Sequence, residues 1–256
     1  MINDPLAELY KKRLIEQFRN VQHGALNLYF SDLYSEISSR LGARLHILEI
    51  GAGAGTSSIF LTNYDISRTD LIDSNPGLVR AGVDAHNLPE MDETYDSVIG
   101  LHTLHHLADP ITALKEMLRV LKPDGKIILI EPYVSAFSYF IYRIFHQEDT
   151  SIYLRKNHFD KGSSKDPSTG NQIIGQTIFN RKLMRSELNG LLGNDYLVTK
   201  HYRDFLVFFS TGGINKPIKV NTRMIQIILS VEKRIPQKIM RLIGSTMVIV
   251  IEPKYP

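Results

Sequence analysis

Three glycines at alternate positions follow an acid in residues 46–61, HILEIGAGAGTSSIFL. They are Gly51, Gly53 and Gly55. Glycine permits positive φ and has no Cβ, so a ligand can lie against the main chain and a helix N-terminus at this point. A dinucleotide site needs G-x-G-x-x-G, whereas the sixth position here is Thr56. Glu49 would repel a pyrophosphate, so the pattern favours a cationic ligand such as an ammonium or a sulfonium.

Further acids stand where a bound nucleoside would need them. Asp70 ends a predicted strand 19 residues after Gly51, and its carboxylate can accept both hydroxyls of a ribose. Asp73, in the turn that follows, is the competing candidate. Asp84 offers an acceptor to an adenine amino group, and Ala85 offers the ring an apolar floor. The alternative interpretation of the glycines and acids is a tight strand–helix turn without a ligand.

Candidate acid–base groups follow two later strands. His105 and His106 come just after the fourth predicted strand, and His106 is the preferred general base. The alternative is that this pair packs against the next helix or caps it. Glu131 ends the fifth strand and Tyr133 follows it, so both are expected on the acceptor side, where Glu131 can hydrogen-bond an acceptor hydroxyl.

A second group of candidates lies further along the chain. His146 and Glu148, in FHQED, join an imidazole to a carboxylate, a combination that suits several divalent ions. Because no fixed ligand spacing such as H-E-x-x-H is present, we expect no metal and expect this pair to contact an acceptor. His158 and Asp160 are looser candidates. A run of aromatic residues lines an acceptor pocket or belongs to the core: Tyr133, Phe137, Tyr139, Phe140, Tyr142 and Phe145.

Alternating strands and helices must position these residues. Apolar runs bounded by turn residues predict strands at 45–50, 66–72, 79–83, 97–101 and 126–130, with helices at 56–62 and 110–121. This alternation predicts a doubly wound parallel α/β sheet, in which ligands bind at the carboxyl ends of the strands. Outside this core we expect two helices over 6–41 broken near Gly24, a strand within 196–209, two helices over 218–243 interrupted at Pro236, and a closing strand at 246–252.

Composition excludes several classes of protein. The 256 residues include no cysteine, which rules out a disulfide framework, a thiolate zinc site and a cysteine nucleophile. The first residues, MINDPLAELYKKR, are polar and charged, unlike a signal peptide, and no apolar run approaches the roughly 18 residues that span a bilayer. We therefore expect a cytoplasmic protein.

Positive charge gathers in one segment. The net charge is only +3, but residues 216–241 contain seven Lys or Arg and a single acid, Glu232. Apolar residues recur there at helical spacing, which predicts a basic amphipathic helix pair. One interpretation is a lid with a solvated basic face, and another is weak contact with an anionic membrane surface or a lipid-phosphate-linked substrate. Nucleic acid is not expected as a partner, because no aromatic-interleaved basic patch is present.

Several stretches in one order resemble class I S-adenosylmethionine-dependent methyltransferases, in particular the methyltransferase-11-like group. They are LEIGAGAGTS, TDLIDSNP, VDAHNLP, TYDSVIGLHTLHHLADP, ALKEMLRVLKPDGKIILIEP and FHQED, and they run from about residue 48 to 149. A narrower resemblance is to bacterial members met among surface-glycan biosynthesis genes. One departure is Asp124, which replaces a glycine in a surface turn.

The resemblance implies the positions of the cofactor, S-adenosylmethionine, and of its product, S-adenosylhomocysteine. The methionine part and cofactor backbone would lie on Glu49, Gly51, Ala52, Gly53 and Gly55. The ribose would be held by Asp70, the adenine framed by Asp84 and Ala85, and the sulfonium covered by His102. The implied fold is a Rossmann-like, seven-stranded sheet, mostly parallel with an antiparallel last strand, plus N-terminal helices and a helical lid.

The expected activity is methyl transfer to an oxygen or nitrogen atom of a small-molecule or glycan-type acceptor. The alternatives are an NAD-dependent oxidoreductase and a non-catalytic cofactor-binding protein of the same fold. One domain overall is expected, with four parts: 1–44 as a helical extension, 45–132 as the cofactor-binding half, 133–195 as an acceptor-side insertion, and 196–256 as the remaining strands with the lid.

Overall fold

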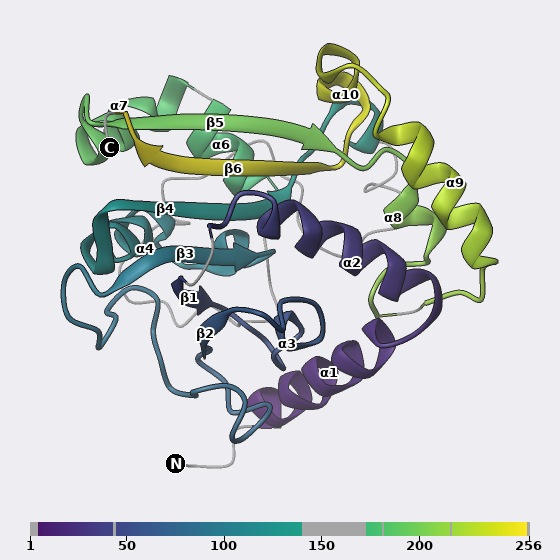
Figure 1. The fold of residues 1–256 in the computed structure, drawn as a ribbon, viewed down its shortest axis with the longest axis horizontal. Helices are drawn as coiled ribbons and strands as arrows, with labels where there is room; N and C mark the ends of the chain where they lie inside the picture. Colours follow the sequence, from purple (N-terminus) through teal and green to yellow (C-terminus); the bar gives the residue numbers. More distant parts are fainter. Residues whose placement is uncertain (1–4, 43–44, 140–172, 181, 216, 255–256) are drawn as a thin grey trace.

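A six-stranded sheet forms the centre of the computed structural model, which describes residues 5–42, 45–139, 173–180, 182–215 and 217–254 (Figure 1). The strands are β1 (His46–Ile50), β2 (Asp65–Thr69), β3 (Tyr95–Leu101), β4 (Leu121–Pro132), β5 (Tyr196–Arg203) and β6 (Thr246–Pro253). Their order in the sheet is β2-β1-β3-β4-β6-β5. The first four strands are parallel, and β6 runs antiparallel to both β4 and β5. The mostly parallel, doubly wound sheet with an antiparallel last strand is thereby confirmed.

The strand predicted at 79–83 does not form, so the described sheet has six strands and not seven. A single parallel bridge, between Thr69 and Arg80, is what pairs this segment with β2. Positive φ angles of 85° at Gly77 and 73° at Gly82 interrupt the extended backbone on either side of the bridge. The apolar residues that suggested a strand are used instead as packing, since both Val79 and Val83 are buried.

Helices cover both faces of the sheet. The predicted N-terminal pair is formed by α1 (Pro5–Val21) and α2 (Gly24–Ser38), and the pair before the last strand by α9 (Thr222–Glu232) and α10 (Gln237–Ile243). The other helices are α3 (Ser57–Phe60), α4 (Pro110–Val120), α6 (Ile174–Asn180), α7 (Lys182–Leu192), α8 (Val207–Ser210) and the 3-10 turn η1 (Leu104–His106). In the described part of the chain, none of these helices has the length and apolar character needed to cross a membrane.

Alternate residues of the central strands enter different cores. In β4, Ile127 and Leu129 pack with α4, α6 and α7, whereas Ile128 and Ile130 pack with α2 and with Ile225 of α9. This two-residue alternation between two apolar faces explains the continuous apolar run 126–130, because a parallel strand covered on both sides has no polar face. The result is a three-layer α/β/α arrangement (Figure 1).

The strand order reverses direction between β1 and β3. The chain moves outward from β1 to β2 and then returns to the other side of β1 with β3. In open α/β sheets the ligand crevice lies at such a switch point, outside the carboxyl ends of the strands. Gly51 follows β1 and His102 follows β3, so both stand at this edge.

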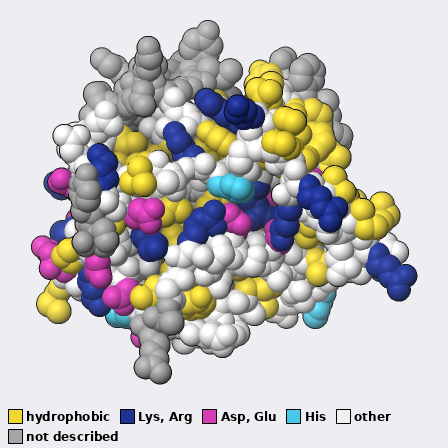
Figure 2. All heavy atoms as spheres, turned by 45° about the horizontal axis from the view of Figure 1, so that its top comes forward, with side chains coloured by type: hydrophobic (Ala, Val, Ile, Leu, Met, Phe, Trp, Pro, Cys, Tyr) yellow, Lys and Arg dark blue, Asp and Glu magenta, His cyan; other side chains and the backbone are white. Residues whose placement is uncertain are grey.

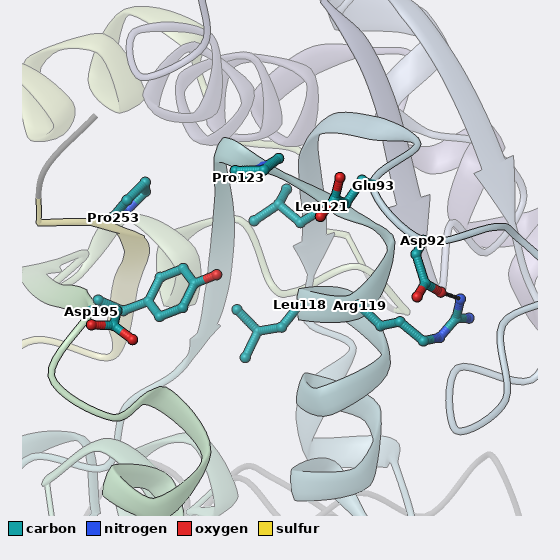
Figure 3. A pocket seen from close by; sticks show the side chains of 9 residues that line it. Asp92, Glu93, Leu118, Arg119, Leu121, Pro123, Asp195 and Pro253 are labelled. Atoms are coloured by element: carbon teal, nitrogen blue, oxygen red, sulfur yellow. Dashed lines mark hydrogen bonds and ion pairs between the residues drawn. The ribbon is translucent and has the colours of Figure 1, made fainter.

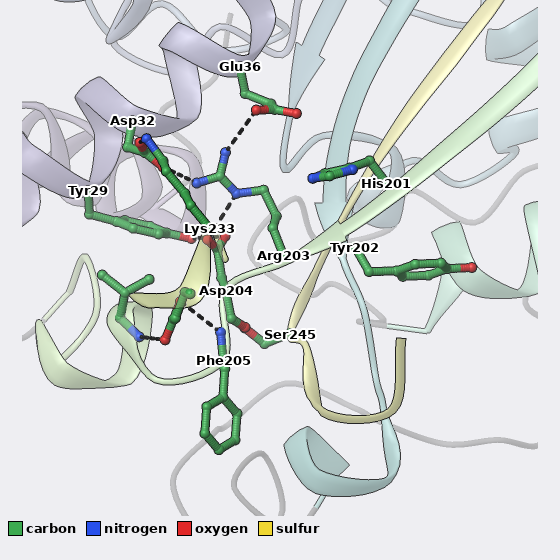
Figure 4. A network of polar contacts seen from close by, with 12 residues as sticks. Tyr29, Asp32, Glu36, His201, Tyr202, Arg203, Asp204, Phe205, Lys233 and Ser245 are labelled. Atoms are coloured by element: carbon green, nitrogen blue, oxygen red, sulfur yellow. Dashed lines mark hydrogen bonds and ion pairs between the residues drawn. The ribbon is translucent and has the colours of Figure 1, made fainter. Parts of the chain in front are cut away.

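A buried charge network joins α2 to the end of β5 and to the C-terminal end of α9 (Figure 4). Arg203, at the end of β5, contacts three carboxylates: its Nε lies 2.9 Å from Asp204 Oδ1, its Nη1 lies 3.7 Å from Glu36 Oε2, and its Nη2 bonds Asp32. Asp32 also pairs with Lys233, which follows α9. Because Arg203 and Asp32 are both buried, their charges depend on each other for compensation.

Replacing Arg203 with Ala should lower the free energy of unfolding by about 3–5 kcal/mol, because buried carboxylates then lose their counter-charge. The measurement is urea-induced unfolding. The control is Lys126→Ala, whose partly exposed pair with Glu252 spans 3.8 Å and should contribute less than about 1 kcal/mol. Equal losses in the two variants would mean that the network is not a stabilising centre.

Candidate functional site

The glycine turn between β1 and α3 adopts the left-handed conformation at all three glycines. The φ angles are 60° at Gly51, 58° at Gly53 and 83° at Gly55. An added Cβ at Gly51 would lie 2.3 Å from Thr103 Cγ2, and one at Gly55 would lie 2.7 Å from Leu78 Cδ2. A side chain at either position would therefore crowd neighbouring protein atoms in addition to straining the backbone.

Gly53 differs because its neighbours leave space. An added Cβ there would meet only Leu14 Cδ2 of α1, at an ordinary 3.5 Å. Its N–H donates to Asp70 Oδ2 at 2.8 Å, and Asp70 Oδ1 accepts from the Ile72 N–H at 2.9 Å. Burial raises the pKa of Asp70, and these backbone bonds offset only part of that effect. The carboxylate at the end of β2 is thus fixed beside the most open glycine of the turn.

Glu49 is buried one residue before the end of β1, with 2% of its surface exposed. Its Oε2 accepts from the Ser57 hydroxyl and lies 3.8 Å from Arg68 Nε. Burial raises the pKa of Glu49 to about 7, against the lowering effects of Ser57 and Arg68. A nearby ligand cation would favour the ionised carboxylate, so the electrostatics of this position suit a cationic group.

The two other predicted acids differ in their surroundings. Asp73 is exposed, and its carboxylate lies 3.9 Å from Lys11 Nζ of α1. Asp84 is exposed as well, and its Oδ1 lies 2.6 Å from His86 Nδ1 and accepts from the His86 N–H at 2.9 Å. Partial burial acts to raise the pKa of Asp84, but the His86 bonds lower it overall. Ala85 is partly buried against the core.

Glu131, at the end of β4, is completely buried and holds the turn after β3. Its Oε1 accepts from the N–H groups of Thr103 at 3.0 Å and Leu104 at 2.7 Å. Its Oε2 accepts from the His105 N–H at 3.3 Å and lies 2.8 Å from His105 Nδ1. Burial raises the pKa of Glu131, with His102 and the backbone bonds opposing the rise. The carboxylate thus holds the backbone of η1 in position.

The histidines of this turn differ in exposure. His105 is 2% exposed, whereas His102 and His106 are half-buried. The His105 ring centroid lies 4.0 Å from that of His106 and 6.2 Å from that of His102. His102 has a positive φ of 54°, unusual for a residue with a side chain. Its N–H is held by the Ile130 carbonyl at 2.8 Å, so this conformation is supported by β4.

Tyr133 lies beside α10 and is buried. Its hydroxyl donates to the Arg241 carbonyl at 2.9 Å, and its N–H donates to the Ser245 carbonyl at 2.8 Å. Four predicted acceptor-side or loose candidates lie outside the described residues: His146, Glu148, His158 and Asp160. The same holds for the aromatic residues Phe140, Tyr142 and Phe145. Among the residues that are described, no three His, Asp or Glu side chains gather so as to hold a metal ion.

Several supporting residues are missing from the sequence prediction. Ser57 and Arg68 surround Glu49, and Thr103 donates from its hydroxyl to the Ile50 carbonyl at 3.2 Å. Ser74 Oγ donates to the Gly53 carbonyl at 2.6 Å, and Asn75 Nδ2 donates to the Ala54 carbonyl at 3.0 Å. The Ser74 and Asn75 bonds each span 21 residues, so no local spacing in the sequence signals them.

A shallow pocket of about 620 Å³ lies at the opposite edge of the sheet (Figure 3). Leu121 starts β4 and Tyr196 starts β5, and both line it, together with Asp92 and Arg119, which pair at 2.7 Å. Because ligands of such sheets bind at the carboxyl ends of the strands, this pocket is not the candidate site. The candidate site is the edge formed by the glycine turn, Asp70 and the turn after β3.

Comparison with known proteins finds a family match in this same part of the chain. Residues 48–129 match the family described as a methyltransferase domain. An uncharacterised methyltransferase of Bacillus subtilis is 29% identical over 107 residues, which cover 36% of this chain and 42% of that protein. A demethylmenaquinone methyltransferase of Paenarthrobacter aurescens is 33% identical over 98 residues, or 33% of this chain and 38% of that protein. The chain thus aligns with about two fifths of these curated relatives.

Solved structures share the fold over most of the chain. A SAM-dependent methyltransferase of Archaeoglobus fulgidus superposes with a TM-score of 0.52 at 17% identity, covering 91% of this chain and 96% of that one. A SAM-dependent methyltransferase of Thermotoga maritima gives a TM-score of 0.50 at 19% identity, covering 88% and 89%. These likenesses show a Rossmann-like methyltransferase fold.

Two glycine variants should separate the energetic cost of side-chain crowding from the cost of a strained backbone. Gly77→Ala should cost about 1–2 kcal/mol of stability, because φ is 85° and nothing lies within 4 Å of the added Cβ. Gly51→Ala should cost a further 1–3 kcal/mol or so, because its Cβ overlaps the Thr103 side chain. Urea unfolding of both variants measures the difference. If Gly51→Ala is no worse than Gly77→Ala, the contact with Thr103 does not constrain the turn.

Proposed function

We propose that this chain, whose residues 48–129 match a methyltransferase domain, is a class I S-adenosylmethionine-dependent methyltransferase that transfers a methyl group to a small-molecule or glycan-type acceptor. The observation that carries the proposal is the turn of three positive-φ glycines at the switch point of the sheet, within the family match. The acceptor atom proposed is oxygen or nitrogen.

The residues at this edge fit the cofactor in shape and charge. A Cβ at Gly53 would meet only Leu14, at 3.5 Å, and the carboxylates of Glu49 and Asp70 each lie within one residue of the end of two adjacent strands. We assign the methionine part to Glu49 and to the glycine turn, with Ala52 and Gly55 completing its backbone. We assign the ribose to Asp70, the adenine to Asp84 and Ala85, and the sulfonium end to His102.

When bound, S-adenosylmethionine supplies an activated methyl group on a sulfonium, so the protein mainly positions the acceptor and excludes water. In our proposal Glu131 positions the turn after β3 through the N–H groups of Thr103, Leu104 and His105. His106, which is half-buried, is the general base for an acceptor proton, and buried His105 supports it from the Glu131 side.

The acceptor is assigned to the second part of the chain. The family match stops at residue 129, before Glu131 and Tyr133, so residues 133–195 are free to differ between relatives. Tyr133, His146 and Glu148 are our candidates for acceptor contacts. A second candidate acceptor is a quinone-type ring carbon, favoured by the 33% identity to a demethylmenaquinone methyltransferase. That identity covers a third of the chain and bears mainly on the cofactor-binding half.

Two alternatives remain to be separated from methyl transfer by experiment. An NAD-dependent oxidoreductase would need a pyrophosphate to lie beside Glu49, on a turn with Thr56 where the third glycine belongs. A non-catalytic protein of the same fold would bind the cofactor and give no turnover. The expected cytoplasmic location also stays a prediction.

Calorimetric titration of the purified chain tests the cofactor. We expect micromolar binding of S-adenosylmethionine and S-adenosylhomocysteine and none of NAD. Gly53→Val should abolish binding, because its side chain fills the open side of the turn. Binding of NAD alone would overturn the proposal, and tight binding by Gly53→Val would overturn the placement of the site. Release of S-adenosylhomocysteine with candidate glycan, amine and quinone acceptors then distinguishes an enzyme from a binding protein.

Asp70→Asn and Asp73→Asn should differ in cofactor affinity. A hydrogen bond to a charged group contributes about 1.5–3 kcal/mol, so Asp70→Asn should weaken binding by tenfold or more. Asp73, exposed and 3.9 Å from Lys11, should matter less than about threefold. Because Asp70 also holds Gly53, thermal unfolding without ligand and titration with a 2′-deoxyribose analogue are the controls. If Asp70→Asn weakens the analogue as much as the natural ligand, Asp70 acts on the turn and not on the ribose.

A further inference from the structure

Large aliphatic side chains are exposed along α9 and α10. Met224, Ile227 and Val231 of α9 are 55%, 63% and 53% exposed, and Ile239 and Leu242 of α10 are 49% and 63% exposed. Within each helix they recur every three or four residues, so they form one exposed apolar flank on each helix. Ile225 and Met240 are the buried apolar residues that hold the same helices on the body of the protein.

The charged side chains around this flank have one sign. Between residues 217 and 244, all of which are described, every exposed ionisable side chain is basic: Lys219, Arg223, Lys233, Arg234, Lys238 and Arg241. Figure 2 shows hydrophobic side chains interspersed with Lys and Arg on the side of the molecule where Figure 1 places α9 and α10. We call these six basic residues, together with the exposed aliphatic residues of α9 and α10, the α9–α10 surface.

The single acid of this segment, Glu232, is buried. Glu232 is 7% exposed, and its carboxylate accepts from the N–H groups of Phe205, Leu206 and Val207 at 3.0, 2.6 and 3.1 Å. These bonds attach α9 to the end of β5 and the start of α8. The exposed face of α9 and α10 therefore carries no acid, because the one carboxylate of the segment serves the interior.

We propose that the α9–α10 surface docks on an anionic lipid bilayer, with the aliphatic side chains in the headgroup region and the basic side chains on lipid phosphates. Basic residues beside exposed aliphatic ones, with no exposed acid, are the composition of an interfacial helix. A protein partner is favoured less, because Lys is depleted in protein interfaces, whereas Lys219, Lys233 and Lys238 are all exposed here. Nucleic acid would gain nothing from the aliphatic side chains.

The docking surface adjoins the acceptor side of the candidate site. The Arg241 carbonyl of α10 accepts from the Tyr133 hydroxyl at 2.9 Å, and Tyr133 stands two residues after Glu131. A bilayer against α10 would thus bring a lipid-anchored acceptor close to the carboxyl end of β4. This last step rests on the proposed function, whereas docking itself does not require methyl transfer.

Vesicle flotation tests the docking. Wild-type protein is mixed with vesicles of phosphatidylcholine alone, or with a quarter of phosphatidylglycerol added. We expect binding to the anionic vesicles that weakens as salt rises, and little binding to the neutral ones. Arg234→Gln with Lys238→Gln should weaken anionic binding by about fivefold per charge. Ile227→Ser with Leu242→Ser should weaken it by about tenfold.

Matched surface variants are the controls. Lys115→Gln on α4 and Met91→Ser, which is 81% exposed, remove a similar charge and a similar side chain elsewhere and should leave binding unchanged. Cofactor titration on all variants shows that each is folded, and a failed titration of the wild type counts against the proposed function alone. Absence of anionic vesicle binding, or equal binding by the docking and control variants, overturns the proposal. So does self-association of the wild type that the docking variants abolish.

Discussion

The fully buried carboxylate of Glu131 connects β4 to the turn after β3 in the candidate site. Glu131 stands on β4, yet it collects backbone N–H groups from the turn that ends β3, and it bonds the His105 ring. Burial makes the charge costly unless these donors surround it, so the carboxylate and the turn depend on each other. The position of His105 follows directly from this interaction, whereas the backbone of His102 is held by the Ile130 carbonyl of the same strand. The glycine turn then closes on Thr103 of the same segment.

Electrostatics at the neighbouring strand end follow a different principle. Glu49 is partly compensated by Arg68, and its pKa of about 7 leaves the carboxylate close to balance between protonated and ionised forms. Asp70 is bound by backbone donors and held next to the most open glycine. The site thus combines one carboxylate that responds to a nearby cation with another that is fixed in place. Such a pair suits a ligand with a positive end and a hydroxylated end.

Local patterns in the sequence predicted most of the fold, and long-range contacts escaped prediction. The strand at 126–130 and the turn at the glycines after residue 50 depend mainly on local residue types, so both were predicted correctly. The prediction of a strand at 79–83 was wrong because the positive φ angles of Gly77 and Gly82 interrupt the extended backbone that the two valines favour. The partners of Glu49 and Glu131 come from other elements, so no sequence spacing could reveal them. The same is true of Arg203, whose three acidic partners include two on α2.

The network around Arg203 also bears on how the chain folds during synthesis. Asp32 and Arg203 are 171 residues apart, so the first carboxylate leaves the ribosome long before its counter-charge exists. Until β5 and α9 are made, Asp32 has neither Arg203 nor Lys233 as a partner. The contact between α2 and the last strands can therefore be completed only late in synthesis, as a contact of high sequence separation.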